Sequence, residues 1–288
     1  MENGKTYIGI DFGGTTIHGG LVRDDKILKQ SMVKTGNNRP AEDIFESITG
    51  LIKELAEGCD IDGIGVGVPV PAGPDSDVLK DAVNIESMEG FPLKRRLAER
   101  FSLPVLLEND ARCMVLGEYM AGALQGYPDC ACITLGTGLG CGLIVDGSIY
   151  RGAKYWGGEI WNIPYGDSGA SFEYMSSISG LETLFIALGG DELDPEAMYA
   201  RFKEGDKIAA NAFELYGERI GRIIATVFCM LDPGMIAVGG GLSRAYDAFS
   251  GSMMKIVKES VGERAIGRVV RAALIEDAAI IGAASLFV

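Results

Sequence analysis

The sequence predicts an α/β protein made of two similar domains that face each other across a cleft. Its 288 residues suffice for one large domain or two modest ones. Two stretches, residues 8–27 (IGIDFGGTTIHGGLVRDDKI) and 133–149 (ITLGTGLGCGLIVDGSI), share one pattern of strand, glycine-threonine turn, strand, aspartate turn and strand. An internal duplication of this kind indicates two domains of one design. We therefore expect the two glycine-threonine turns to meet at one cleft.

Strands and helices alternate along the first half of the chain. Residues 41–57 carry Ile44, Ile48 and Leu51 on one helical face, and prolines end the strand that follows. The segment Glu108-Asn109-Asp110 is expected to cap a helix, since these residue types accept hydrogen bonds from free backbone N–H groups. The expected strands are 7–11, 17–22, 26–34, 62–70 and 104–107, and the expected helices are 41–57, 92–101 and 111–123.

The second half repeats the strand meander and then becomes helical. Asp232-Pro233-Gly234 ends the longest helical pattern. The expected strands are 131–135, 141–145, 148–150 and 235–238, and the expected helices are 206–231, one from 243 and 277–286. No linker or low-complexity segment separates the halves. We expect a small domain over residues 1–108, completed by the C-terminal helix 276–288, and a large domain over residues 109–275.

Composition excludes several classes of function. The formal net charge of −14 makes nucleic acid an unfavourable partner. The longest apolar stretch, residues 278–288, is too short to span a membrane, and the N-terminus has no signal-peptide pattern. A single His cannot build a multi-His metal site. The six cysteines form no CxxC pair, so we expect buried free thiols and a cytoplasmic protein.

The clustered glycines point to a nucleotide-binding site. GKT at residues 4–6 lacks the earlier glycine of a P-loop, and GTGLGCG at 136–142 precedes a strand rather than the helix of a dinucleotide-binding fingerprint. The turn DFGGTT at 11–16 lies between two strands, where its backbone N–H groups can hold a phosphate and Asp11 can hold a hydrated Mg²⁺. The alternative for this turn alone is a plain hairpin.

Four ordered motifs resemble those of the ROK family of bacterial sugar kinases and sugar-responsive repressors. IGIDFGGT (8–15) resembles the first phosphate motif of actin-like kinases, LGTGLG (135–140) the second, and LDPGMIAVGGG (231–241) the adenosine motif, with ENDA (108–111) between them. The resemblance covers essentially the whole chain. It implies the two-domain actin-like ATPase fold, also called ribonuclease H-like, with a duplicated mixed sheet and an interdomain cleft.

The resemblance also implies roles for individual residues, with ATP and Mg²⁺ as cofactors. Asp110 matches the catalytic base that takes the proton from the attacking sugar hydroxyl; its structural alternative is a helix cap. The sugar-binding positions are Asn84, Asn109, Asp110, Glu159, Asn162 and Glu173, and Glu173 could instead be an ordinary helix residue. The nucleotide-binding positions are Asp11, Gly13, Gly14, Thr15, Thr16, Gly136, Thr137, Gly138, Gly240 and Gly241, with Asp11 also holding Mg²⁺ through water.

The chain departs from the family at the metal loop. The family usually reads Gly-Glu-x-x-His and then a cysteine-rich loop, whose His and three Cys bind zinc. Here Asn162 stands at the His position, and residues 163–172 contain no Cys or His. We therefore expect no zinc site. Trp156 and Trp161 flank Glu159, and one of them could stack on a sugar ring or simply be structural.

These observations favour an ATP-dependent hexose kinase that phosphorylates a sugar hydroxyl. The resemblance implies the 6-hydroxyl of glucose or a close hexose such as allose, and a possible homodimer. The alternatives are a sugar-binding regulator without kinase activity and a kinase for an N-acetylated hexosamine. A repressor of the family carries a DNA-binding segment ahead of the first phosphate motif, which here begins at residue 8. We expect neither nucleic acid nor membrane as a partner.

Overall fold

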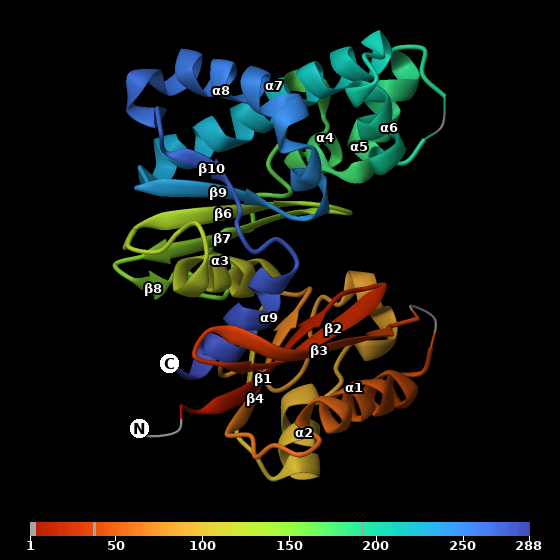
Figure 1. The fold of residues 1–288 in the computed structure, drawn as a ribbon, viewed down its shortest axis with the longest axis vertical. Helices are drawn as coiled ribbons and strands as arrows, with labels where there is room; N and C mark the ends of the chain where they lie inside the picture. The colour runs from red at the N-terminus through yellow and green to blue at the C-terminus, as the bar shows by residue number, and fades with distance from the viewer. Residues whose placement is uncertain (1–3, 37–38, 192) are drawn as a thin grey trace.

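Two five-stranded mixed sheets, one above the other in Figure 1, form the framework of the protein. The computed structural model describes residues 4–36, 39–191 and 193–288. The first sheet has the strand order β3-β2-β1-β4-β5 and the second β10-β9-β6-β7-β8. The strands are β1 Thr6–Phe12, β2 Thr16–Arg23, β3 Lys26–Lys34, β4 Gly63–Val68, β5 Val105–Asn109, β6 Cys130–Leu135, β7 Leu139–Val145, β8 Ser148–Ile149, β9 Met235–Gly239 and β10 Val269–Arg271.

The two sheets have the same topology, which confirms the duplication read from the sequence. In each, the first strand pairs antiparallel with the second, and the second with the third. On its other side the first strand pairs in parallel with the fourth, which pairs in parallel with the fifth. Because parallel strands need a crossover, helical segments separate β1 from β4 and β6 from β9.

Helices cover the outer face of each sheet, and two more lie between the sheets (Figure 1). α1 begins at Ala41 and ends at Ala56, burying the apolar face that predicted it. The remaining helices are α2 Leu93–Phe101, α3 Asp110–Ala121, α4 Phe172–Ser176, α5 Ile178–Ala187, α6 Pro195–Lys203, α7 Lys207–Leu231, α8 Tyr246–Val261 and α9 Asp277–Ala284. A 3-10 helix over Gly241–Ala245 precedes α8. The chain beyond β9 therefore becomes a regular α-helix three residues later than the sequence predicts.

The helices α3 and α9 pack against each other between the sheets, and α9 also lies on β1 and β4. Glycines permit this close approach. A Cβ on Gly9 of β1 would lie 2.0 Å from the Ile280 carbonyl oxygen, and one on Gly65 of β4 would lie 1.8 Å from that of Ala283. Some of the glycines therefore serve helix packing rather than phosphate binding.

Each domain has its own apolar core, which lies between the sheet and the helices on its outer face. The first sheet ends at Asn109, and α9 joins it from the far end of the chain. The finer division at residues 108 and 275 stays a prediction. Cys113, Cys130, Cys132 and Cys141 are buried free thiols as expected, whereas Cys59 and Cys229 are exposed.

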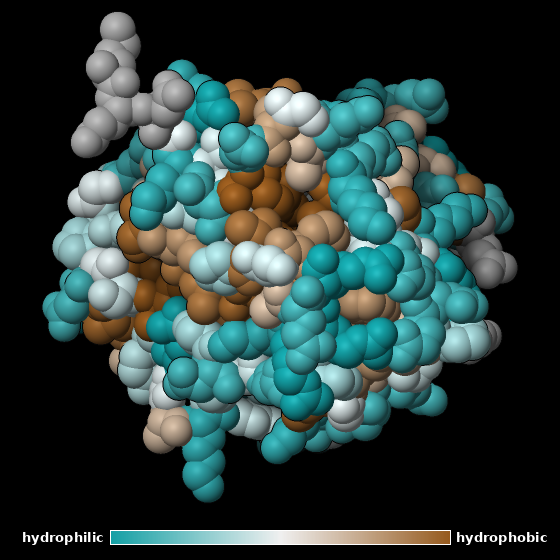
Figure 2. Space-filling view, turned by 90° about the horizontal axis from the view of Figure 1, so that it is seen from below, coloured by the Kyte–Doolittle hydropathy of each residue, from teal (hydrophilic) through white to brown (hydrophobic). Residues whose placement is uncertain are grey.

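The surface seen from below in Figure 2 is largely hydrophilic, with apolar side chains gathered in patches among the charged ones. This view looks onto the end of the molecule that carries α1 and α2 in Figure 1. Among the described residues, no helix combines the length and the apolar character that crossing a bilayer requires.

Candidate active site

The first glycine turn connects β1 to β2 and is closed by its own backbone. The N–H of Gly13 donates to the carbonyl of Thr16 at 3.1 Å. Thr35, just beyond β3, braces the same turn: its N–H donates to the Thr15 carbonyl at 2.9 Å and its hydroxyl to the Gly13 carbonyl at 2.7 Å. The backbone N–H groups of Gly14 and Thr15 have no hydrogen-bond partner among the described residues. The turn can therefore offer these donors to an anion.

The second glycine turn connects β6 to β7. A third turn, at Gly240 directly after β9, packs against Leu135 at the end of β6. The N–H of Gly136 donates to the Gly138 carbonyl at 3.1 Å. Gly240 has φ +77°, and a Cβ there would lie 2.4 Å from the carbonyl oxygen of Leu135. Both the backbone conformation and the space therefore require glycine at position 240. Because β6 and β9 are parallel neighbours, their carboxyl ends bring these two turns together.

Asp110 is the first residue of α3, directly after the end of β5. The helix cap is Asn109, whose side-chain oxygen accepts from the N–H of Arg112 at 3.2 Å. The cap therefore lies in the expected segment 108–110, and the structural alternative for Asp110, a helix cap, is wrong. One carboxylate oxygen of Asp110, Oδ1, accepts from the N–H of Ala111 at 2.7 Å and from Asn109 Nδ2 at 2.9 Å. The other oxygen, Oδ2, accepts no hydrogen bond from another described residue.

Four carboxylates from distant parts of the chain interact electrostatically in series. Asp11 interacts with Asp110, Asp110 with Glu159, and Glu159 with Glu173. Burial, with a contribution from the charge of Asp110, raises the pKa of Asp11 to about 7. Burial, with a smaller contribution from Glu159, raises the pKa of Asp110 to about 6. The cluster therefore has groups that exchange protons near neutral pH.

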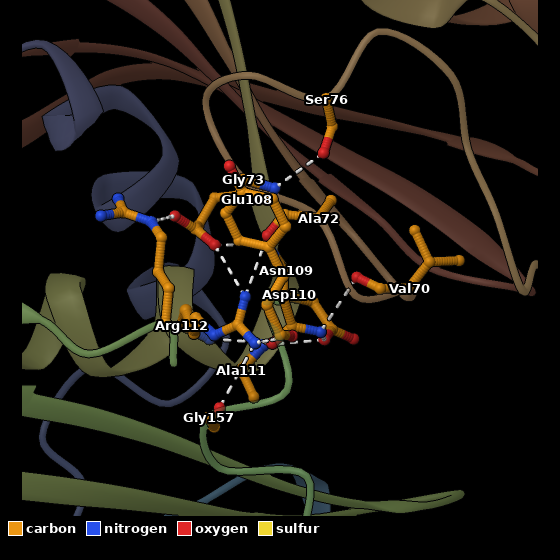
Figure 3. A network of polar contacts seen from close by, with 12 residues as sticks. Val70, Ala72, Gly73, Ser76, Glu108, Asn109, Asp110, Ala111, Arg112 and Gly157 are labelled. Carbon is orange, nitrogen blue, oxygen red and sulfur yellow. Dashed lines mark hydrogen bonds and ion pairs between the residues drawn. The ribbon is translucent and has the colours of Figure 1, made fainter. Parts of the chain in front are cut away.

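A buried ion-pair network holds the loop that carries Glu159 (Figure 3). Glu108 and Arg112 lie 3.1 Å apart with side chains 0% and 1% exposed, and Arg151 donates to the other oxygen of Glu108 at 2.5 Å. The Arg112 guanidinium also donates to the carbonyl oxygens of Ala72 at 2.9 Å, Tyr155 at 2.5 Å and Gly157 at 3.3 Å. Arg112 thus joins the loop after β4 to the loop before Glu159.

Glu159 lies between a cation and an indole. Its Oε1 is 3.8 Å from an Arg112 nitrogen, and its Oε2 accepts from the Nε1 of Trp161 at 2.9 Å. Burial raises the pKa of Glu159, and these two partners oppose the rise. Trp161 therefore has a hydrogen-bonding role, while Trp156 is exposed.

Glu173, in the first turn of α4, contacts the second glycine turn. Its Oε2 accepts from the backbone N–H of Leu139 at 3.1 Å. A Cβ on Gly138 would lie 2.6 Å from the same oxygen. Glu173 thus lies beside both Glu159 and the turn that the sequence assigns to phosphate binding.

Comparison with models of protein families shows which family the chain belongs to. The model of the ROK family matches residues 7–288. The chain belongs to the ROK family. Glucokinase of Thermotoga maritima is 29% identical over 304 residues, covering 97% of this chain and 96% of that protein. N-acetyl-D-glucosamine kinase of Vibrio atlanticus is 29% identical over 260 residues, covering 82% and 84%.

Solved structures of ROK proteins share the fold. The ROK family glucokinase from Streptomyces griseus, in complex with glucose and AMPPNP, has a TM-score of 0.85 at 29% identity, with 98% of each chain covered. A putative sugar kinase from Cytophaga hutchinsonii has a TM-score of 0.86 at 26% identity, covering 98% of this chain and 99% of that one. These likenesses confirm the two-domain actin-like fold.

The structure brings together some of the site residues expected from the ROK resemblance, but not all of them. It brings Asp11, Asp110, Glu159 and Glu173 into one cluster and joins Gly240 to the second turn. Asn162 is exposed, and the side chain of Asn84 lies outside the described residues. The roles of all these residues stay predictions. In the described ranges, no group of three or more His, Cys, Asp or Glu could hold a metal ion.

Sequence reasoning missed the residues that support this ROK site. The sequence patterns indicate no role for Thr35, Arg112 or Arg151, and they place Glu108 only in the helix-capping segment and the ENDA motif. The spacing of Glu108 and Arg112, one helical turn apart, was the available signal for their pairing. Their burial and their carbonyl partners depend on loops distant in sequence, so spacing alone could not predict them.

Proposed function

We propose that this ROK protein is an ATP-dependent hexose kinase that transfers the γ-phosphate to a sugar hydroxyl, with Asp110 as the general base. The acceptor we favour is the 6-hydroxyl of glucose or a close hexose such as allose. The observation that carries the proposal is the environment of Asp110: a desolvated carboxylate with one committed and one uncommitted oxygen, beside Asp11 and Glu159. The kinase names of its ROK relatives support the same reaction class.

In this mechanism Asp110 Oδ2 accepts the proton of the sugar hydroxyl as the hydroxyl oxygen attacks the γ-phosphorus. The bond from the γ-phosphorus to the β,γ-bridging oxygen breaks, and ADP is the leaving group. The bonds from Ala111 and Asn109 to Oδ1 hold the carboxylate in orientation throughout. A pKa of about 6 leaves Asp110 mainly ionised at neutral pH while keeping it basic enough to take a proton. Positioning and neutralisation of charge supply most of the remaining rate enhancement in phosphoryl transfer.

Asp11 fits a role next to a magnesium ion. Its carboxylate accepts no hydrogen bond from the described residues, and burial together with Asp110 raises its pKa to about 7. A carboxylate in this state lacks a positive partner, and Mg²⁺ prefers oxygen ligands and keeps several waters. Asp11 would hold the ion through water, and the ion would neutralise charge on the ATP phosphates. The two glycine turns would donate their backbone N–H groups to the same phosphates.

The acceptor would lie among the remaining carboxylates. Glu159 and Glu173 can accept hydrogen bonds from two sugar hydroxyls, and the Asn109 side chain lies beside Asp110. Carboxylates read hydroxyl groups well because a missing hydroxyl leaves a buried acceptor unpaired. Two relatives named as kinases of different sugars, glucose and N-acetyl-D-glucosamine, make an N-acetylated hexosamine the alternative acceptor.

A coupled assay of ADP release tests this function. Glucose, allose, mannose, fructose, N-acetylglucosamine and N-acetylmannosamine are each supplied with ATP and Mg²⁺, and Asp110→Asn serves as the control for contaminating kinases. We expect turnover with at least one hexose, reduced by about 10²–10⁴-fold in the control. Binding of a sugar without turnover would instead favour a sugar-binding regulator, and turnover only with an N-acetylated sugar would favour the alternative acceptor.

A further inference from the structure

The carboxylate of Glu173 interacts both with the proposed sugar-binding carboxylate Glu159 and with the second glycine turn. Its Oε2 accepts from the N–H of Leu139 at 3.1 Å, at the point where the turn enters β7. Its Oε1 accepts no hydrogen bond from the described residues and is free to meet a sugar hydroxyl. One oxygen of Glu173 is thus bound to the turn, and the same side chain interacts electrostatically with Glu159.

The backbone around Glu173 reinforces this connection. The N–H of Glu173 donates to the carbonyl of Trp161 at 3.0 Å, and Trp161 donates in turn to the Glu159 carboxylate. The N–H of Ile178, at the start of α5, donates to the carbonyl of Gly136 at 2.9 Å. The segment from Glu159 to Ile178 therefore connects the carboxylates proposed to bind sugar with the second glycine turn.

We propose that Glu173 couples the two sites, so that sugar and nucleotide each strengthen the binding of the other. This inference rests on the proposed function. Without sugar, the negative charge of Glu173 stands beside a turn that must receive phosphate. A sugar hydroxyl that donates to Oε1 disperses this charge and fixes the side chain, which orders the turn in advance. Both effects favour the nucleotide, and by linkage the nucleotide favours the sugar equally.

The test measures the coupling directly. The dissociation constant of Mg-AMPPNP is determined by calorimetry with and without saturating glucose, or another hexose from the panel if that one turns over. We expect the hexose to tighten AMPPNP binding by about 5-fold or more, the usual lower range for coupled sites. In Glu173→Ala the ratio should fall to about 1, whatever the loss of sugar affinity itself.

Glycine substitutions in the turn provide a matched pair. A methyl group on Gly138 would meet only Glu173, at 2.6 Å from Oε2, whereas one on Gly136 meets nothing within 4 Å. Gly138→Ala should therefore weaken glucose binding without nucleotide and lower the coupling ratio, and Gly136→Ala should keep the ratio. In the Glu173→Ala background, Gly138→Ala should have no further effect, because the Glu173 carboxylate that its methyl group would displace is absent.

The outcomes distinguish failure of the proposed coupling from failure of the proposed kinase function. A wild-type ratio of 1 in an active kinase, or an unchanged ratio in Glu173→Ala or in Gly138→Ala, overturns the coupling and leaves the kinase proposal standing. Absence of turnover with every sugar in the panel overturns the proposed function, and the coupling with it. A ratio that falls in both variants and persists in Gly136→Ala supports the inference.

Discussion

The guanidinium of Arg112 and the carboxylate of Glu108 form an ion pair at 3.1 Å in which both side chains are almost completely buried. Glu108 directly precedes the Asn109-Asp110 step that leads into α3, and Arg112 lies two residues after it. The Nε of Arg112 has no hydrogen-bond partner in the described structure. The two terminal guanidinium nitrogens, in contrast, donate to backbone carbonyl oxygens. The pair therefore connects the base of the candidate active site to the loop that carries Glu159.

Replacing Arg112 by Met should destabilise the fold strongly. It leaves the buried Glu108 carboxylate with Arg151 as its remaining ion-pair partner and with a hydrogen bond from the Asn109 N–H. Breaking a buried pair in this way costs about 3–5 kcal/mol. Lys258→Met is the matched control, since its pair with Glu263 has side chains 56% and 69% exposed. Urea denaturation should show a large drop in midpoint for Arg112→Met and almost none for the control. Equal midpoints for the two variants would show that the buried network adds nothing to stability.

Asp110→Asn should lower kcat by about 10²–10⁴-fold without lowering the thermal midpoint. Because burial raises the pKa of Asp110 to about 6, the amide should raise the midpoint above that pH. The amide oxygen can still accept from Ala111, but it cannot take a proton from the sugar hydroxyl. Because Asn109 is the cap, Asn109→Ala should instead cost about 1 kcal/mol of stability. Steady-state kinetics and thermal melts of both variants separate base from cap. Near-normal kcat in Asp110→Asn would contradict the base assignment.

The pH profile of kcat/KM should follow the ionisation of Asp110. Burial raises its pKa to about 6, and a general base works only when deprotonated. The rate should therefore rise with pH through about 6 and level off above it. Initial rates in overlapping buffers with constant Mg²⁺ and ionic strength measure the profile. A profile that is flat from pH 5 to 8 would exclude a titrating base in this range.

Asp11→Asn should stabilise the protein more at pH 8 than at pH 5.5, where only part of the effect is present. The folded pKa of about 7 exceeds the ordinary 3.8, so the folded state binds the extra proton between these values. Stability is therefore lost as pH rises through that window, and the amide removes the loss. Thermal melts at both pH values measure the effect, with the exposed Asp60→Asn as control. Destabilisation of Asp11→Asn at pH 8 would show that the carboxylate is favourably paired.

Gly65→Ala should destabilise the protein by about 1–3 kcal/mol or more. Its methyl group would lie 1.8 Å from the carbonyl oxygen of Ala283 in α9, so the helix must move away from the sheet. Gly50→Ala, in the exposed face of α1 with open space around it, should stabilise by about 0.5–1 kcal/mol. Chemical denaturation of both variants measures the difference. A neutral Gly65→Ala would mean that α9 shifts at no cost.

Local patterns predicted most elements of this fold. The repeated strand-turn-strand design appears in both sheets with identical strand pairing, and α1 and α7 lie within a residue of their expected limits. Such features depend on residues near one another in the chain, whose alternation and capping chemistry are visible in the sequence. Placement of the cap was harder, because Asn109 and Asp110 are both suitable caps and only the backbone path after β5 decides between them.

The sequence by itself determined the fold class, the family and the residue types available for phosphate and sugar. Only the tertiary structure decided which charges meet: the Asp11–Asp110 interaction, the Glu108–Arg112 pair and the contact of Glu173 with Leu139 each join segments or bury groups in ways that spacing does not encode. The physical reason is that electrostatic interaction and desolvation depend on distance and burial in space. Periodicity reports on neighbours along the chain, whereas pKa values and coupling between sites arise from packing across it.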